Sequence, residues 1–168
     1  MKAIVVYESC FGNTYSVCTA LAEGLREAGA DVEQLEVSAA QGHALDCDLL
    51  VLGAPTHSHG LPTAGTRKQA ASAGGQAPVT GIRELLEQVN LGQVGRCVLL
   101  DTVSGHGFFY GSAAKDMAKR LKRRGGVAAE HRSFTVEGRE GPLAADALDE
   151  AKAWGRELTG SSALTQQD

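Results

Sequence analysis

The chain has 168 residues, the usual length of one domain, and 16 Lys and Arg against 20 Asp and Glu give a net charge of −4. This mildly acidic balance argues against a dedicated nucleic-acid-binding protein, which would have a surplus of basic residues. Glycine is in surplus, with 21 residues where average usage would give about 12. Because 43% of the residues are hydrophobic and the glycines follow no repeat, the surplus indicates a folded chain with conformationally demanding loops.

The cysteines and the N-terminus bear on the cellular compartment. Cys10, Cys18, Cys47 and Cys97 form no C-x-x-C motif and have no histidines at zinc-site spacing. The apolar run at residues 3–7 is too short for a signal peptide, and no stretch approaches the roughly 20 apolar residues of a membrane helix. We therefore expect reduced thiols in a cytoplasmic protein with no nucleic-acid or membrane partner.

Short apolar runs alternate with helical patterns along the chain. Continuous apolar runs predict strands buried on both faces at residues 3–7, 48–53 and 97–101. Less regular segments predict an edge strand at 31–37 and a final strand at 127–136. Apolar residues at helical spacing predict helices at 17–28, 82–89, 113–121 and 143–158.

This alternation of strands and helices predicts an α/β fold. We expect a doubly wound five-stranded parallel sheet with helices on both faces, as one domain over residues 1–160 followed by a polar tail at 161–168. Ligands of such sheets bind outside the carboxyl ends of the strands, where the strand order switches. The loops after the first, third and fourth strands are therefore the candidate functional segments.

The first of these loops leads directly into a helix N-terminus. Ser9 and Thr14 supply hydroxyls, Asn13 supplies an amide, and Gly12 allows the backbone to approach a ligand oxygen. Together with the free N–H groups of the helix they form a cradle for one phosphate. The alternative is a structural turn, in which Asn13 or Thr14 only caps the helix.

Two other phosphate chemistries are absent from this loop. A Walker loop needs a Gly-Lys pair, and the chain has none. A phosphatase of the Cys-x5-Arg type would need arginine at the position of Ser16, so Cys10 lacks the guanidinium that would clamp a phosphoryl group. Cys10 is therefore not expected to act as a nucleophile.

The loop after the third strand runs from Gly53 to about residue 78, a length that usually has a function. His57 and His59 lie two residues apart and would point the same way in an extended loop, while Arg67 and Lys68 add positive charge nearby. No third ligand follows at a recognisable spacing, so a metal site is not predicted. Contact with solvent and contact with a planar cofactor both stay open.

The loop after the fourth strand runs from Asp101 to Ser112 and contains three consecutive aromatic residues. Phe108, Phe109 and Tyr110 are bracketed by glycines. Because these rings do not follow the spacing of a segment that packs into the core, they are a candidate surface for stacking on a flat ligand. The alternative, that one or two of them cap the core, is equally open.

The segment YESCFGNT at residues 7–14 resembles the phosphate loop of the flavodoxin-like flavoproteins. It is closer still to the YESxFGNT version in a group of short bacterial flavodoxin-family proteins. GAPTH at residues 53–57 and the segment 135–154, which includes VEGREGPL, resemble the same group. The resemblance covers nearly the whole chain and implies the flavodoxin strand order 2-1-3-4-5.

The resemblance also implies FMN as the cofactor. By position, the loop at residues 9–14 would hold the phosphate, residues 55–57 would lie along the isoalloxazine ring, and the loop at 101–111 would close its other side. The group often has tryptophan at the position of His59. The candidate cofactor-binding residues are Ser9, Phe11, Gly12, Asn13, Thr14, Pro55, Thr56, His57, His59, Asp101, Thr102, Gly105 and Phe108.

We therefore expect an FMN-binding protein that transfers electrons to a redox partner protein or to a small-molecule acceptor. The alternatives are an FMN-dependent reductase of a small acceptor such as a quinone, and a flavin-free interaction or sensing module. No residue stands out as an acid, base or nucleophile, although His57, His59 and His106 have the chemistry to move protons. The basic residues of segment 115–124 are either a solvated helix face or a dock for an acidic partner.

Overall fold

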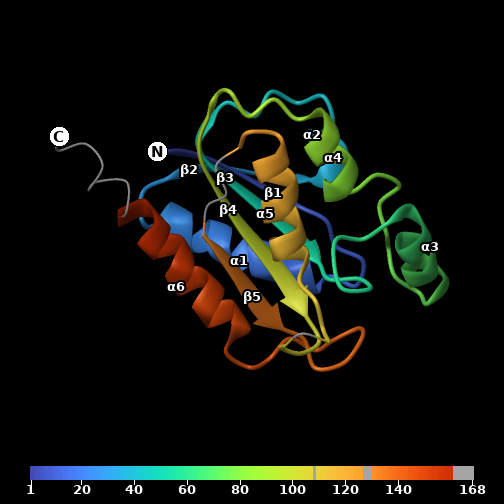
Figure 1. Ribbon diagram of the computed structural model, residues 1–168. Coiled ribbons are helices and arrows are strands. Elements are labelled where there is room, and N and C mark those ends of the chain that lie inside the picture. The colour runs from blue at the N-terminus through green and yellow to red at the C-terminus, as the bar shows by residue number, and fades with distance from the viewer. Residues whose placement is uncertain (108, 127–129, 161–168) are drawn as a thin grey trace.

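The computed structural model describes residues 1–107, 109–126 and 130–160. Five parallel strands form one sheet in the order β2-β1-β3-β4-β5, as Figure 1 shows. The strands are β1 (Lys2–Tyr7), β2 (Asp31–Glu36), β3 (Cys47–Pro55), β4 (Val94–Val103) and β5 (His131–Thr135). The expected doubly wound sheet, its strand order and the edge position of β2 are confirmed.

Helices cover both faces of this sheet. On one face lie α1 (Asn13–Glu27) and α6 (Ala147–Gly160), side by side in Figure 1. The other face is covered by α2 (Val37–Ala40), α4 (Ile82–Gln88) and α5 (Ala113–Arg123). Among the described residues, no helix has the length and apolar character needed to cross a bilayer.

The central strand β1 explains why its apolar run is continuous rather than alternating. Ala3 and Val5 pack into the core beneath α1 and α6, whereas Ile4 and Val6 pack into the core on the opposite face. Successive side chains of a strand point to opposite faces, so a strand covered on both sides needs apolar residues at every position.

The segment 53–78, expected as a loop, contains the helix α3 (Ala64–Ser72). Thr63 caps its N-terminus through a reciprocal pair of hydrogen bonds with Thr66. Only Arg67 and Ala70 of this helix are buried, so it carries no apolar stripe that sequence periodicity could reveal. In Figure 1, α3 stands to one side of the sheet.

Smaller differences concern element bounds. The short helix α2 was not expected, and α6 begins at Ala147 rather than at residue 143. Part of the expected strand 127–136 lies outside the described residues, and β5 begins at His131. The division into a domain at 1–160 and a tail at 161–168 stays a prediction, because the tail also lies outside them.

Two glycines allow α1 and α6 to approach closely. A Cβ atom on Gly24 of α1 would lie 2.0 Å from the carbonyl oxygen of Lys152, and one on Gly155 of α6 would lie 2.2 Å from that of Leu21. Real Cβ atoms do not tolerate such distances, so glycine is required at this crossing.

We predict that Gly24→Ala lowers the free energy of unfolding by about 1–3 kcal/mol, the usual cost of overpacking a core. The clash with the Lys152 backbone exceeds the gain of roughly 1 kcal/mol in helix propensity. Chemical denaturation measures the difference. Gly160→Ala, at an open position in α6, is the control and should not destabilise; an unaltered stability of the Gly24 variant would contradict the close approach.

Candidate functional site

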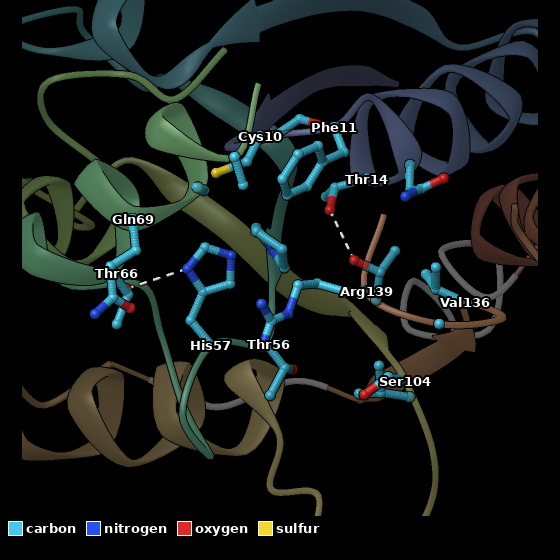
Figure 2. A pocket seen from close by; sticks show the side chains of 18 of the residues that line it. Cys10, Phe11, Thr14, Thr56, His57, Thr66, Gln69, Ser104, Val136 and Arg139 are labelled. Atoms are coloured by element: carbon cyan, nitrogen blue, oxygen red, sulfur yellow. Dashed lines mark hydrogen bonds between the residues drawn. The ribbon is translucent and has the colours of Figure 1, made fainter. Parts of the chain in front are cut away.

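A cleft of about 470 Å³ opens at the carboxyl ends of β1, β3, β4 and β5, a volume within the range of small-molecule sites. It lies where the chain order of the strands switches, since β2 and β3 flank β1 on opposite sides. Figure 2 shows the side chains around it. The cleft is lined by Ser9, Cys10, Phe11, Asn13, Thr14, Pro55, Thr56, His57, Ser58, Thr66, Gln69, Ala70, Ala73, Thr102, Val103, Ser104, Val136, Gly138 and Arg139.

The loop after β1 brings the N-terminus of α1 to the cleft. Gly12 occupies the N-cap position with a φ of 90°, and its N–H donates to Ser9 Oγ at 3.1 Å. No side chain caps the helix, and its first turn contains no acidic residue. The first N–H groups of a helix have no partner within the helix, so this end is suited to bind an anion.

Two hydrogen bonds fix this loop to segments far away in the sequence. Thr14, almost fully buried, places its Oγ1 2.9 Å from Oγ1 of Thr102 at the end of β4. Asn13 Nδ2 donates to the Glu140 carbonyl at 3.0 Å, in the loop after β5. Both side chains therefore connect the loop after β1 to the other segments that surround the cleft.

The loop after β3 turns sharply. The backbones of His57 and Gly60 exchange two hydrogen bonds of 2.9 and 3.0 Å, while Ser58 and His59 between them have positive φ values of 45° and 76°. The expected extended loop, with both histidines pointing the same way, is therefore wrong. A two-residue turn with positive φ reverses the chain direction.

The two histidines end in different surroundings. His57 lines the cleft, and its Nδ1 lies 3.1 Å from Thr66 Oγ1 of α3. Burial, aided by the positive charge of Arg67, lowers the pKa of His57, so its imidazole is neutral at pH 7. His59 is exposed outside the cleft, where its carbonyl accepts from the Ser112 N–H.

Asp101 lies behind the cleft rather than in its lining. It is fully buried, and its Oδ2 accepts from Thr56 Oγ1 at 3.1 Å, Ser112 Oγ at 2.6 Å and the Ala114 N–H at 3.0 Å. The carboxylate thereby joins the end of β3 to the start of α5. Its place favours positioning Thr56, which does line the cleft, over direct contact with a ligand.

The loop after β4 is only partly described. Gly105 packs against Tyr110, since a Cβ atom there would lie 2.5 Å from the ring. Phe109 is 83% exposed, Tyr110 is 49% exposed, and neither lines the cleft. Phe108 lies outside the described residues, so its stacking role stays a prediction.

Sequence reasoning missed two groups of lining residues. Thr66, Gln69, Ala70 and Ala73 come from α3 and its end, a helix without a periodic signal. Val136, Gly138 and Arg139 come from the loop after β5. This loop is part of the VEGREGPL motif, but no local pattern places that motif at the same sheet edge as residues 9–14.

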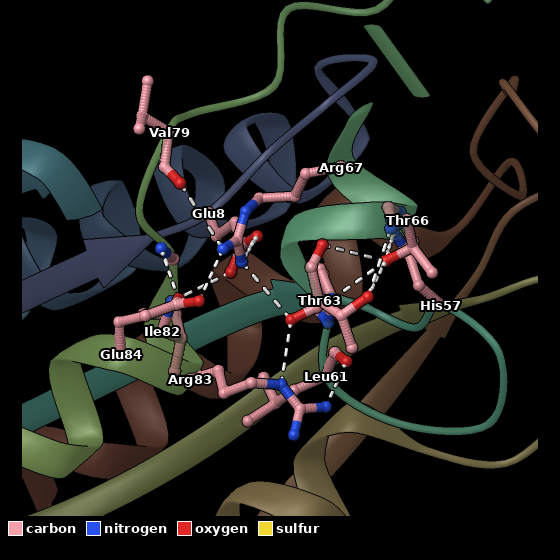
Figure 3. A network of polar contacts seen from close by, with 12 residues as sticks. Glu8, His57, Leu61, Thr63, Thr66, Arg67, Val79, Ile82, Arg83 and Glu84 are labelled. Atoms are coloured by element: carbon pink, nitrogen blue, oxygen red, sulfur yellow. Dashed lines mark hydrogen bonds and ion pairs between the residues drawn. The ribbon is translucent and has the colours of Figure 1, made fainter. Parts of the chain in front are cut away.

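A buried ion pair holds α3 against the segment that follows β1, as Figure 3 shows. Arg67 Nη1 lies 3.4 Å from Glu8 Oε1, and Arg67 Nη2 lies 2.6 Å from Glu84 Oε1. Glu8 is completely buried and also accepts from the Ile82 N–H at 2.9 Å. Burial raises the pKa of Glu8, against the opposing effects of that N–H and of Arg67. The network joins the residue after β1 to α3 and α4.

Cys10 lies next to this network, and its surroundings do not activate its thiol. Burial, together with the negative charge of Glu8, raises the pKa of its thiol to about 11. The thiol is therefore protonated at neutral pH, and the thiolate is the reactive form.

The sequence model of the flavodoxin family matches residues 5–154. The chain belongs to the flavodoxin family. Proteins of this family bind FMN and transfer electrons, and the chain is accordingly an FMN-binding, flavodoxin-like electron-transfer protein. A search of curated proteins finds no matching sequence.

Solved structures show the same flavodoxin fold. Oxidised flavodoxin 1 from Bacillus cereus has a TM-score of 0.65 at 16% identity, over 95% of this chain and 98% of that one. The two-electron reduced flavodoxin of Megasphaera elsdenii has a TM-score of 0.58 at 19% identity, over 92% and 98%. Rubredoxin oxygen:oxidoreductase of Desulfovibrio gigas has a TM-score of 0.62 at 18% identity, over 99% of this chain but 37% of that one.

We predict that Arg67→Met destabilises this flavodoxin-family protein by about 3–5 kcal/mol, because it leaves the carboxylate of Glu8 buried without its charge partner. The free energy of unfolding of the flavin-free protein measures the loss. Lys68→Met, at the exposed neighbouring position of α3, is the matched control and should change stability by less than about 0.5 kcal/mol. Equal stabilities of the two variants would refute the role of the ion pair.

The lowered pKa of His57 predicts a pH dependence of stability. As pH falls below about 6.5, the unfolded chain gains a proton on this residue before the folded chain does, which favours unfolding. The contribution of His57 is therefore complete above pH 6.5 and is lost as the pH falls through its folded pKa. Denaturation curves of the flavin-free protein should show this slope, and His57→Gln should reduce it; identical slopes would contradict a neutral, half-buried His57.

Proposed function

We propose that this flavodoxin-family protein is an electron carrier that holds FMN in the cleft at the carboxyl ends of β1, β3, β4 and β5. The observation that carries the proposal is the uncapped N-terminus of α1, which meets the cleft with no acidic residue in its first turn. Of the described residues that line the cleft, none is acidic. This donor set fits a ligand with a negatively charged phosphate.

The phosphate would be held by the loop after β1. Ser9, Asn13 and Thr14 line the cleft there, and Gly12 gives the turn its left-handed backbone. The backbone N–H groups at the start of α1 supply hydrogen-bond donors, and the helix dipole favours negative charge at the same point.

The ring of FMN would lie along the end of β3. Pro55, Thr56 and His57 line that part of the cleft, and the aromatic side chain of Phe11 faces it from the loop after β1, as Figure 2 shows. Thr56 is fixed by Asp101, and His57 is fixed by Thr66. When bound, FMN supplies reversible electron acceptance, while the chain holds and shields the ring.

The partner is a protein donor or acceptor of electrons, and α5 presents a basic face toward it. Lys115, Lys119, Lys122 and Arg123 are exposed on this helix, whereas Arg120 is paired with Asp116. These charges favour a partner with an acidic surface. The same residues would also serve as a solvated helix face without any partner.

We predict that Gly12→Val weakens FMN binding by at least about tenfold, the equivalent of 1.4 kcal/mol. A branched side chain is strained at a φ of 90° and adds bulk at the N-cap of the helix that would hold the phosphate. Quenching of flavin fluorescence measures the affinity.

Gly42→Val is the matched control for this substitution. Gly42 also has a positive φ, of 72°, with open space around it, but it lies away from the cleft. Both variants should lose stability, and only the Gly12 variant should lose FMN affinity. Equal affinities of the two variants would remove the loop after β1 from the site.

One set of measurements separates the carrier from the two alternatives. A carrier contains stoichiometric FMN, is reduced by dithionite, and does not by itself oxidise NADH or NADPH in the presence of a quinone. Sustained nicotinamide oxidation with the quinone would instead show a reductase. A colourless protein that fails to bind FMN at micromolar concentration would show a flavin-free module.

A further inference from the structure

Arg139 brings a positive charge into the cleft from the loop after β5. Figure 2 shows its side chain reaching across the cleft toward Thr56 and His57, the region proposed to hold the flavin ring. His57 is neutral, so Arg139 is the one charged side chain among the described residues that line the cleft.

The guanidinium of Arg139 has no hydrogen-bond or ion-pair partner among the described residues. Most other arginines of the chain do have partners, and these include Arg26, Arg67, Arg83, Arg96, Arg120, Arg124, Arg132 and Arg156. The acidic neighbours of Arg139 in its own loop, Glu137 and Glu140, do not line the cleft. Its charge therefore acts on the cleft without a local counter-charge in the lining.

The backbone that carries Arg139 is well anchored. Val136 N–H donates to the Val103 carbonyl at 2.8 Å, and Glu137 N–H donates to that of Pro142 at 2.7 Å. Asn13 binds the Glu140 carbonyl from the opposite wall. These bonds hold the loop over the cleft, so only the side chain of Arg139 needs to move to contact a ligand.

We propose that Arg139 tunes the reduction potential of the flavin, by stabilising the negative charge that the ring gains on reduction. The inference rests on the proposed function. Each electron from a donor adds one negative charge to the ring, which is retained unless a proton follows from solvent. A nearby guanidinium favours the charged product over the neutral oxidised ring, whereas a cleft without a cation would not.

The test compares Arg139→Gln with Arg139→Lys, which keeps the charge, and with Arg26→Gln. Arg26 is exposed in the last turn of α1 and outside the cleft lining, so its variant makes the same change in net charge elsewhere. Dithionite titration against reference dyes gives the reduction potentials. Flavin fluorescence gives the dissociation constants of oxidised FMN and of riboflavin.

We expect Arg139→Gln to weaken the binding of reduced FMN by at least about fivefold more than the binding of oxidised FMN. This factor is the effect expected for two unit charges in contact in a medium as polar as water. A fivefold ratio corresponds to about 41 mV in a one-electron couple. The potential should fall in this variant, recover largely in Arg139→Lys, and remain nearly constant in Arg26→Gln. High salt should reduce the difference, because the guanidinium is exposed.

Two results would overturn the inference without refuting the proposed FMN site. One is an unchanged potential in Arg139→Gln, or a change equal to that of Arg26→Gln. The other is a loss of affinity for oxidised FMN but not for riboflavin at constant potential, which would place Arg139 on the phosphate instead. Failure of the wild-type protein to bind FMN would instead refute the proposed function itself.

Discussion

The buried ion pair of Glu8 and Arg67 fixes the walls of the cleft in relation to each other. Glu8 directly precedes the loop at residues 9–14, and Arg67 lies in α3, which supplies another wall. Glu8 also accepts from the N–H of Ile82 at the start of α4. Burying two charges is costly, so the pair need not add to net stability. Its effect is on arrangement: a displaced α3 would leave a carboxylate buried without its partner. This matters because α3 buries little apolar surface of its own.

The electrostatics of the cleft are opposite to those of the chain as a whole. The net charge is −4, yet the lining contains Arg139, the N-terminus of α1 and no acidic residue among those described. The local charge at the carboxyl edge of the sheet depends on the direction of the helices and on the residues of the loops. The net charge of the chain contains no information about either. The parallel strands direct the start of α1 toward this edge, so the positive end of its dipole faces the cleft.

The fold was predictable from local patterns, and the site only in part. Continuous apolar runs located the three central strands, β1, β3 and β4, because a doubly covered sheet leaves no polar face. Residues that follow β1 and β3 directly, such as Ser9 and Thr56, line the cleft as expected by position. Asp101 was expected at the cofactor but lies behind Thr56, because a strand residue next to the cleft can also point into the core. His59 leaves the cleft because a tight turn, rather than an extended loop, follows His57.

The sequence by itself determined the alternation of buried strands and amphipathic helices, and with it a parallel sheet whose functional loops share one edge. It also placed Gly12 where the backbone adopts a positive φ. Only the tertiary structure decided which distant side chains enter the cleft, namely those of α3 and Arg139. Their positions depend on contacts between residues far apart in the chain, such as Arg67 with Glu8 and Asn13 with the Glu140 carbonyl. Such contacts leave no periodic signal in the sequence, because each is a single polar interaction. The two segments that it joins come close together in space only when the sheet has formed.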